Sequence, residues 1–266
     1  MGHFTGKAAI VTGGSSGLGL SIAGALVEAG AHVAIVARSA EKLESAIRAL
    51  RPRGQGQVLN VVADVTRPDD VERMMATCLR HFGKLDMLVN CAGSSARGDV
   101  LSTTVEDFRR LMELNFFALV ACTRAALPHL LQSRGHVVNI GSLAAKSASR
   151  FMGGYAASKF AVAAYSQQLR LELAEQGLHV LLVCPGPIAR DEVRVYPGSE
   201  QLPDSARKAG AGVQLERLQP EALAGRILKS CERRDLEIVT PAKARLLFAI
   251  ADLSPTLGDW LLRKFT

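Results

Sequence analysis

Tyr155 and Lys159 stand four residues apart in the segment Y-A-A-S-K. If the chain is helical from Gly154 onwards, the two side chains share one face of that helix. A phenol has an ordinary pKa of about 10 and donates its proton slowly at neutral pH, and a neighbouring ammonium lowers that pKa by stabilising the phenolate. The pair therefore suits general acid-base catalysis. Taken alone, the spacing also fits an aromatic anchor beside a solvated lysine.

A glycine-rich turn, T-G-G-S-S-G-L-G at residues 12–19, follows the first apolar run. Glycines let this backbone bend and approach a pyrophosphate, whose charge would lie at the N-terminus of the next helix, expected over Ser21 to Ala29. The spacing differs from the G-x-G-x-x-G of most dinucleotide-binding proteins, and a tight turn that binds nothing is the alternative. We favour a dinucleotide cofactor. Its predicted contacts in this turn are Gly13, Ser15, Ser16, Gly17, Leu18 and Gly19.

The residue after the second apolar run indicates which nicotinamide cofactor is used. An acidic residue there accepts a hydrogen bond from the ribose 2′-hydroxyl, whereas an arginine accommodates a 2′-phosphate. Here it is Arg38, nineteen positions after Gly19, and no acidic residue lies between it and Glu41. NADP(H) is therefore predicted in preference to NAD(H), although a solvated arginine is the alternative. Further cofactor contacts are predicted where later apolar runs end, at Asp64, Val65, Asn90, Ala92 and Gly93.

Apolar runs of strand length alternate with longer stretches of helical period along the chain. Because the runs are continuously apolar, the strands should be buried on both faces, as in a parallel sheet covered by helices on each side. We predict an α/β fold, a Rossmann-type, doubly wound, mostly parallel sheet of about seven strands in the order 3-2-1-4-5-6-7. The expected strands are Ala8 to Thr12, His32 to Ala37, Val58 to Ala63, Leu85 to Asn90, His136 to Ile140, His179 to Cys184 and Leu236 to Val239.

The bulk composition, with 48% hydrophobic and 21% charged residues in a chain of 266, is that of an ordinary globular protein. One oxidoreductase domain over residues 1–266 is predicted. The formal net charge of +7 suits an anionic cofactor, a phosphorylated substrate or a membrane surface. Basic residues are scattered rather than interleaved with aromatic ones, so no nucleic-acid partner is predicted.

The five cysteines are odd in number and never spaced C-x-x-C. This pattern indicates neither a disulfide framework nor a zinc site, so we predict no metal ligands. A cytoplasmic location, with the thiols reduced, fits best.

Together, the glycine turn, N-C-A-G at residues 90–93, Asn115, Ser142, Y-x-x-x-K at 155–159 and the pair Pro185-Gly186 resemble the classical short-chain dehydrogenase/reductase family over residues 5 to about 190. The resemblance implies that Tyr155 gives a proton to the carbonyl oxygen as hydride arrives from the reduced nicotinamide, and that Ser142 hydrogen-bonds that oxygen. It implies that Lys159 binds the nicotinamide ribose and tunes Tyr155, while Asn115 holds a water that connects Lys159 to solvent. Asn115 could instead cap backbone groups at a helix distortion.

The family pattern also implies nicotinamide contacts from Pro185, Gly186 and Ile188. Many members carry threonine five residues after that proline, where it contacts the carboxamide, and this chain has Arg190. Because a guanidinium cannot accept a hydrogen bond, the backbone near Ile188 would have to hold the carboxamide. Arg190 could instead meet an anionic substrate, or pair with a neighbouring acid in solvent.

Two segments after the family motifs bear on the substrate. Residues 187–218 are polar and carry proline and glycine, and we interpret them as a substrate loop or lid. Residues 243–266 are an apolar tail with flanking lysine and arginine, interrupted too often for a membrane span. The tail is expected to form two short amphipathic helices, which could lie on a bilayer, cover a pocket or pack in an oligomer interface.

The favoured function is reduction of a ketone to a secondary alcohol with NADP(H), in a homo-oligomer that acts on a small molecule. The residues T-G-G-S-S-G at 12–17, V-A-R at 36–38 and D-M-L-V-N-C-A-G at 86–93 also resemble the branch of 3-ketosphinganine reductases, which implies a lipid-like 3-keto substrate. The apolar tail makes peripheral membrane contact a further expectation. Two alternatives keep the fold without turnover. One is a regulatory module that senses NADP, and the other is a membrane-surface protein.

Overall fold

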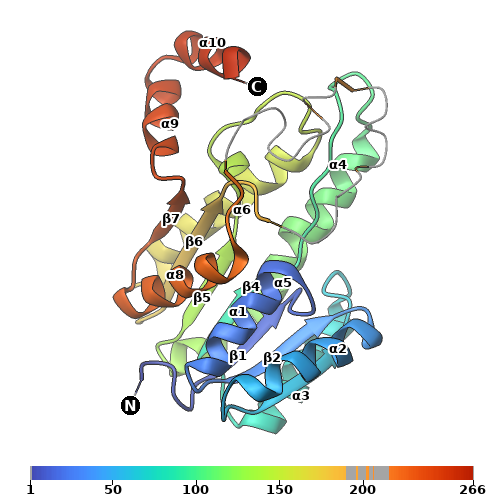
Figure 1. Ribbon diagram of the computed structural model, residues 1–266, viewed down its shortest axis with the longest axis vertical. Helices are drawn as coiled ribbons and strands as arrows, with labels where there is room; N and C mark the ends of the chain where they lie inside the picture. Colours follow the sequence, from blue (N-terminus) through green and yellow to red (C-terminus); the bar gives the residue numbers. More distant parts are fainter. Residues whose placement is uncertain (1, 190–195, 197–201, 204–205, 207–215, 266) are drawn as a thin grey trace.

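Seven strands form one sheet, in the order β3-β2-β1-β4-β5-β6-β7, with every neighbouring pair parallel (Figure 1). The structure is a computed structural model that describes residues 2–189, 196, 202–203, 206 and 216–265. It confirms the predicted fold class and strand order. The strands are β1 (Ala8–Thr12), β2 (His32–Ala37), β3 (Val58–Val62), β4 (Met87–Asn90), β5 (His136–Ile140), β6 (His179–Pro185) and β7 (Glu237–Thr240).

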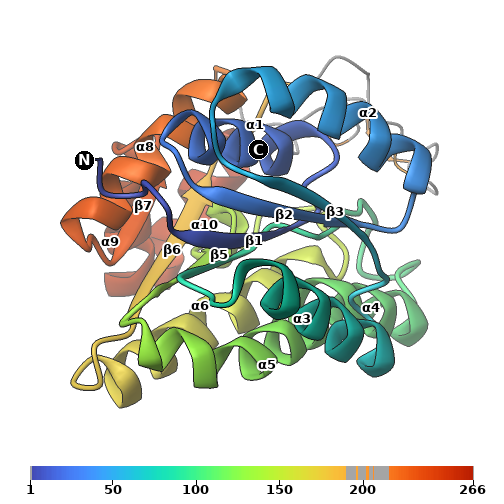
Figure 2. The same ribbon diagram turned by 90° about the horizontal axis from the view of Figure 1, so that it is seen from below.

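Helices cover both faces of the sheet, as the continuously apolar strands require (Figure 2). On one face, Ile22, Leu43 and Ile227 come from three different helices and share one buried apolar cluster with the sheet. Met74 and Leu130 belong to the cluster on the other face. The first layer contains α1 (Gly17–Glu28), α2 (Ala40–Leu50) and α8 (Pro220–Arg233), and the second contains α3 (Pro68–Phe82), α4 (Val105–Met112), α5 (Ala118–Gln132) and α6 (Tyr155–Leu173).

Element boundaries differ from the predictions by a few residues. Helix α1 begins at Gly17 and not at Ser21, because the last two glycines of the turn already form its first turn. Strand β4 begins at Met87 rather than Leu85. The Asp86 backbone N–H donates to Ala8 O, but the Ala8 N–H donates to the Asp86 carboxylate instead of to a backbone carbonyl, so the regular strand pairing ends there.

The unbroken helical stretch at residues 105–132 is long and apolar enough to cross a membrane, with a mean hydropathy of 1.4 over its most apolar window. Its second half is α5, which presents the buried residues Cys122, Ala126 and Leu130 to the sheet. Part of this hydropathy comes from the residues that α5 packs against the sheet, since 39% of the window is buried.

The C-terminal tail forms two helices, α9 (Ala244–Leu253) and α10 (Pro255–Phe265). Phe248 of α9 is buried in a cluster with Val239 of β7 and Val162 of α6. Beyond that anchor, α9 and α10 extend away from the sheet (Figure 1). Several large apolar side chains on them are exposed: Leu246, Leu253, Leu257 and Trp260.

Candidate active site

The carboxyl ends of the parallel strands meet at one edge of the sheet, where an open α/β sheet places its ligands. Thr12, the last residue of β1, links its strand to the turn after β4. Its hydroxyl accepts hydrogen bonds from the backbone N–H groups of Cys91 and Ala92 at 3.1 and 3.2 Å, and donates to Val89 O at 3.3 Å. The first glycine turn and the N-C-A-G segment are therefore held side by side.

The glycine turn has the form that a dinucleotide needs. Gly13 has φ +67°, and a Cβ there would lie 3.0 Å from the Ala92 backbone, while a Cβ on Gly19 would overlap the Gly13 carbonyl. Ser16 is the N-cap of α1, makes no side-chain capping bond, and no acidic residue occurs in the first turn. The N–H groups of that turn therefore point at the exposed edge, where the helix dipole favours an anion. The turn fits a pyrophosphate.

Arg38 and Asp64 lie together where β2 and β3 end. The Asp64 carboxylate accepts from the Thr66 backbone N–H at 3.0 Å and from the Thr66 hydroxyl at 2.7 Å. Burial raises the pKa of Asp64, but the Thr66 hydrogen bonds and the nearby Arg38 charge outweigh it, so the net pKa lies below its ordinary value. Arg38 is exposed and follows the strand directly, and Val65 is buried next to Asp64. The arrangement puts a cation where the adenosine ribose of a bound dinucleotide would lie.

Asn90 faces the interior of the sheet. Its amide nitrogen donates to the Thr123 hydroxyl at 3.0 Å and to the Asn139 carbonyl oxygen at 2.9 Å, and its side chain is buried. Only its backbone stands at the sheet edge with Ala92 and Gly93. Asn90 was predicted to contact the cofactor. In the structure its side chain instead holds neighbouring elements together within the sheet.

Lys159 is buried on α6 and points to the end of β5, where its ammonium donates to the Ile140 carbonyl at 2.7 Å. A Cβ on Gly93 would lie 3.7 Å from Lys159 Nζ, so the N-C-A-G turn passes beside this ammonium. Burial lowers the pKa of Lys159 to about 8. Tyr155 is the first residue of α6, with its ring centroid 5.9 Å from Lys159 Nζ. The helix predicted from the Y-x-x-x-K spacing therefore brings the two side chains to one edge.

Asn115 lies in a π-helical turn, Glu113–Phe117, between α4 and α5. Its amide donates to Ser94 O at 2.8 Å and to the Ser158 hydroxyl at 3.0 Å, and its carbonyl oxygen accepts from Ser94 N at 2.8 Å. The helix distortion that we considered is present, and Asn115 fastens the segment after Gly93 to it. π-turns of this kind are frequent at functional sites.

Ser142 follows β5 and begins a short helical turn, Leu143–Ala145, that packs against α6. Its hydroxyl oxygen accepts from Ala144 N at 3.1 Å. An accepting hydroxyl keeps its own hydrogen as a donor, which is the role that the family resemblance implies for this residue.

The segment after β6 is fixed by backbone bonds. Gly186 N donates to Thr240 O at 2.8 Å, so Pro185 and Gly186 lie beside the end of β7. Ile188 pairs with Leu218, which closes the predicted substrate loop at its base. Arg190 and most of the loop, residues 190–195, 197–201, 204–205 and 207–215, lie outside the described residues. The expectation about the nicotinamide carboxamide therefore stays open.

Two residues of the site escaped sequence reasoning. Ser158 accepts from Asn115 and donates to the Tyr155 backbone carbonyl at 2.7 Å, so it joins the first turn of α6 to the π-turn. Its position inside the Y-A-A-S-K segment could have indicated that Ser158 belongs to the site. Arg97 is buried, lies 4.4 Å from the Tyr196 ring centroid and donates to Ala206 O at 3.1 Å. No spacing rule predicts that contact with the substrate loop.

Comparison with known proteins agrees with this geometry. Residues 7–196 match the family profile described as short chain dehydrogenase. The chain is 36% identical over 228 residues to glycine betaine reductase ATRR of Emericella nidulans, covering 85% of this chain but only 18% of that protein. It is 38% identical over 202 residues to 11-beta-hydroxysteroid dehydrogenase 1A of Arabidopsis thaliana, covering 74% of this chain and 57% of that protein.

Solved structures agree as well. A short-chain dehydrogenase from Streptomyces avermitilis superposes with a TM-score of 0.81 at 31% identity, covering 95% of this chain and 94% of that one. Such enzymes act on small molecules with a nicotinamide cofactor, NAD or NADP, and the glycine turn, the uncapped N-terminus of α1 and the Tyr155 and Lys159 pair fit that chemistry. The chain belongs to the short-chain dehydrogenase/reductase family of oxidoreductases.

Proposed function

We propose that this protein reduces a ketone to a secondary alcohol with NADP(H), using Tyr155 as the proton donor. A single observation carries the proposal: the buried Lys159 ammonium lies beside the Tyr155 ring, at the edge where the glycine turn and Gly93 also lie. A reduced nicotinamide bound there supplies the hydride. The protein must supply the proton and hold the substrate oxygen.

The position of each residue suggests which part of the reaction it performs. Tyr155 donates its proton to the substrate oxygen, and the Ser142 hydroxyl donates a hydrogen bond to the same oxygen. Lys159 favours the phenolate that remains and binds the nicotinamide ribose. Asn115 keeps the Ser94 segment and the π-turn in register, and holds a water that returns a proton to Lys159 from solvent. Pro185, Gly186 and Ile188 line the nicotinamide side.

Arg38 supports the choice of NADP(H). It is exposed at the end of β2, and its charge already acts on Asp64. A guanidinium forms paired, charge-assisted hydrogen bonds with a phosphate, which the 2′-phosphate of NADP offers and NAD lacks. A cell keeps its NADP pool mostly reduced, and this favours carbonyl reduction as the direction.

A lipid-like 3-keto compound is the substrate class that we propose. The apolar side chains on α9 and α10 extend from the end of β7, the strand that pairs with Pro185. The similarity to a protein named for an 11-beta-hydroxysteroid supports an apolar ketone of this kind, as does the resemblance to 3-ketosphinganine reductases. The substrate loop at residues 187–218 would close over it within a single domain, residues 1–266.

The test of this function is an NADPH-coupled screen over ketone classes, including long-chain 3-keto lipids and steroids. Loss of NADPH absorbance with at least one ketone, and greater kcat/KM for lipid-like members, is the expected result. Tight NADPH binding with no turnover across the screen would contradict the proposal and favour a regulatory NADP-binding protein.

The pH dependence of reduction should reflect Lys159. Burial lowers the pKa of Lys159 from 10.5 to about 8, so the ammonium is present below pH 8 and is lost above it. Reduction also needs a protonated Tyr155. Raising the pH therefore cannot increase the reduction rate through either group. We expect kcat/KM for reduction to be level below the transition and to fall by about tenfold per pH unit above it.

The free energy of unfolding should rise over the pH range in which reduction slows. Between about pH 8 and 10.5 the unfolded chain binds the Lys159 proton that the folded chain has lost, so the contribution of Lys159 to the free energy of unfolding rises with pH. The measurement is a pH series of kcat/KM and of urea unfolding. Lys146→Met is the control, and it should leave the activity profile unchanged. A profile that stays level to pH 9.5 would contradict the assignment of Lys159.

We propose that the protein is a homo-oligomer. Phe108, Phe117 and Phe160 are between 39 and 50% exposed on α4, the π-turn and α6, which pack against one another. A second copy would cover these rings in a symmetric contact. Light scattering should give the mass of a dimer or tetramer, and Phe117→Ser with Phe160→Ser should lower it. A monomeric wild-type chain would contradict the proposal.

The tail supports a cytoplasmic protein that touches a membrane at its surface. Cys78, Cys122, Cys184 and Cys231 are buried free thiols, which is in keeping with a reducing compartment. Leu253 and Trp260 are 87 and 55% exposed, and Arg263 and Lys264 occupy the last turn of α10. Apolar side chains beside cations suit the surface of an anionic bilayer.

Co-sedimentation with vesicles tests this contact. Binding to phosphatidylserine vesicles should exceed binding to neutral vesicles and should be lost in Leu253→Ser with Trp260→Ser. Leu171→Ser is the control, because Leu171 on α6 is 78% exposed but lies outside the tail, and this variant should bind as the wild type does. If the tail variant and the wild type sediment with the vesicles equally, the tail does not mediate membrane binding.

A further inference from the structure

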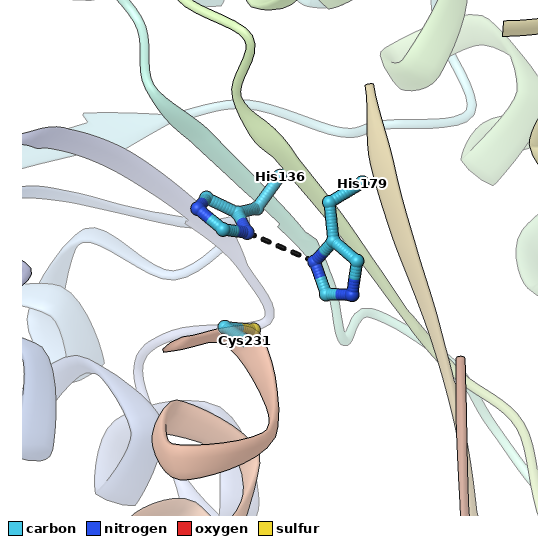
Figure 3. A group of neighbouring side chains, drawn as sticks. All are labelled: His136, His179 and Cys231. Carbon is cyan, nitrogen blue, oxygen red and sulfur yellow. Dashed lines mark hydrogen bonds between the residues drawn. The ribbon is translucent and has the colours of Figure 1, made fainter. Parts of the chain in front are cut away.

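A second cluster of reactive side chains, drawn in Figure 3, lies at the amino ends of β5 and β6, whereas the candidate active site lies at the carboxyl ends of the strands. His136 is the first residue of β5, His179 is the first residue of β6, and Cys231 lies in the last turn of α8. The Nδ1 atoms of the two histidines are 2.9 Å apart. One ligand atom from each of the three residues lies within 4.8 Å of the other two, and all three residues are buried.

The outer nitrogens of both rings have partners that fix where the hydrogens lie. His179 Nε2 is 2.8 Å from the Asp235 carbonyl oxygen, which only accepts, so this nitrogen carries the hydrogen. Lys7 Nζ is 2.9 Å from His3 Nε2, and an ammonium only donates, so His3 Nε2 accepts. His136 Nε2 is 3.4 Å from the same His3 nitrogen, whose single lone pair already faces the ammonium.

The 2.9 Å contact between the two Nδ1 atoms is a hydrogen bond. A neutral imidazole carries one hydrogen, and in His179 it is on Nε2, so His179 Nδ1 accepts and His136 Nδ1 donates. The Cys231 sulfur lies within 4.8 Å of a nitrogen of each ring. A metal ion between the three atoms would take the place of this hydrogen, which would move to Nε2 of the His136 ring.

We propose that His136, His179 and Cys231 bind a Zn²⁺ ion. Imidazole nitrogen and thiolate sulfur are the ligands that zinc prefers, and its Zn–N and Zn–S bonds of about 2.0–2.1 and 2.3 Å require the two nitrogens to be about 3.3 Å apart in a tetrahedral site. The present N–N separation of 2.9 Å needs a small opening, and the Cys231 sulfur, within 4.8 Å of the nitrogens, needs to move closer to them. Zinc would form a bond to the Cys231 sulfur as the thiol proton leaves to solvent.

The surroundings resemble those of known zinc ligands in one further respect. A zinc-bound histidine usually donates its other N–H to a carbonyl or another acceptor, which fixes the ring. Asp235 O has that position for His179. The exposed His3 ring lies against His136 with centroids 5.5 Å apart, so a path for the ion leads past His3.

This inference goes beyond the proposed reductase function and does not depend on it. Sequence spacing predicted no metal ligands, because positions 136, 179 and 231 lie on three separate elements and only the fold brings them together. The ion would join β5, β6 and α8 at the edge away from Lys159, so its effect is on stability rather than on chemistry.

Metal titration of the full chain, first stripped with a chelator, tests the site. Adding Co²⁺ should produce a thiolate-to-metal charge-transfer absorption that saturates at one equivalent, and Zn²⁺ should displace it. Zn²⁺ at about 100 times Kd should raise Tm by roughly 5 to 10 °C, while Mg²⁺ should not. Absence of the thiolate band in the wild type, or equal Tm shifts with Zn²⁺ and Mg²⁺, would overturn the proposal.

Variants locate the site. Cys231→Ser should lose the charge-transfer band, and His179→Gln should lose the Tm shift, which provides a second test if either variant folds poorly. Cys78→Ser is the matched control, because Cys78 is equally buried in the apolar cluster on the other face of the sheet. A folded Cys231→Ser protein that keeps the band, or a Cys78→Ser protein that loses it, would show that the metal binds elsewhere.

Discussion

Replacing Tyr155 with phenylalanine should lower kcat for ketone reduction by about 10²- to 10⁴-fold, the range over which a positioned general acid accelerates proton transfer. The change removes one hydroxyl at the start of α6 and leaves the ring in place, so packing against Ala144 and Ala156 should persist. Binding of NADPH should change little, because Lys159 keeps its bond to the Ile140 carbonyl. Steady-state kinetics and NADPH fluorescence titration measure the two effects separately.

Tyr165→Phe is the matched control. Tyr165 lies on the same helix, half-buried against Phe116, and burial raises the pKa of its hydroxyl. It should keep nearly full activity. Unchanged turnover in Tyr155→Phe, or equal losses in both variants, would show that the phenol of Tyr155 is not the proton donor.

Replacing Arg38 with aspartate should weaken NADPH binding by about 10- to 150-fold, since a hydrogen bond to a charged group contributes roughly 1.5 to 3 kcal/mol. NADH binding should be unchanged or improve, because a carboxylate at this position can accept from the ribose 2′-hydroxyl. The preference ratio of kcat/KM for the two cofactors is the measurement.

Arg48→Asp tests whether overall charge explains the effect. Arg48 is exposed on α2, and its replacement changes the net charge by the same amount. It should leave the NADPH-to-NADH ratio near that of the wild type. If Arg38→Asp weakens both cofactors equally, Arg38 does not hold the 2′-phosphate.

The sequence predicts the sheet well because its signal is local. Val33 to Val36 and Val180 to Cys184 are buried without interruption, so each run indicates a strand covered on both faces, and the alternation of such runs with helices indicates parallel order. The Y-x-x-x-K pair was equally readable, because helical spacing alone puts Tyr155 and Lys159 on one side of α6.

Side-chain contacts between distant segments could not be predicted from the sequence. Nothing in the local sequence shows that the Asn90 side chain turns into the sheet toward Thr123, or that Asn115 bonds to Ser94 and Ser158. These bonds depend on how α5 and α6 pack on the sheet. The cluster of His136 and His179 was missed for the same reason, since 43 residues separate the two side chains.

At this site, hydride should pass from NADPH to the carbonyl carbon of a ketone. The most direct measurement uses NADPH deuterated at the transferring C4 position with a ketone identified in the screen, followed by mass spectrometry of the product. We expect one deuterium on the carbinol carbon of the alcohol, and about 10²- to 10⁴-fold slower labelling with Tyr155→Phe. Product that lacks deuterium, or NADPH that binds without any ketone being labelled, would contradict hydride transfer at this site.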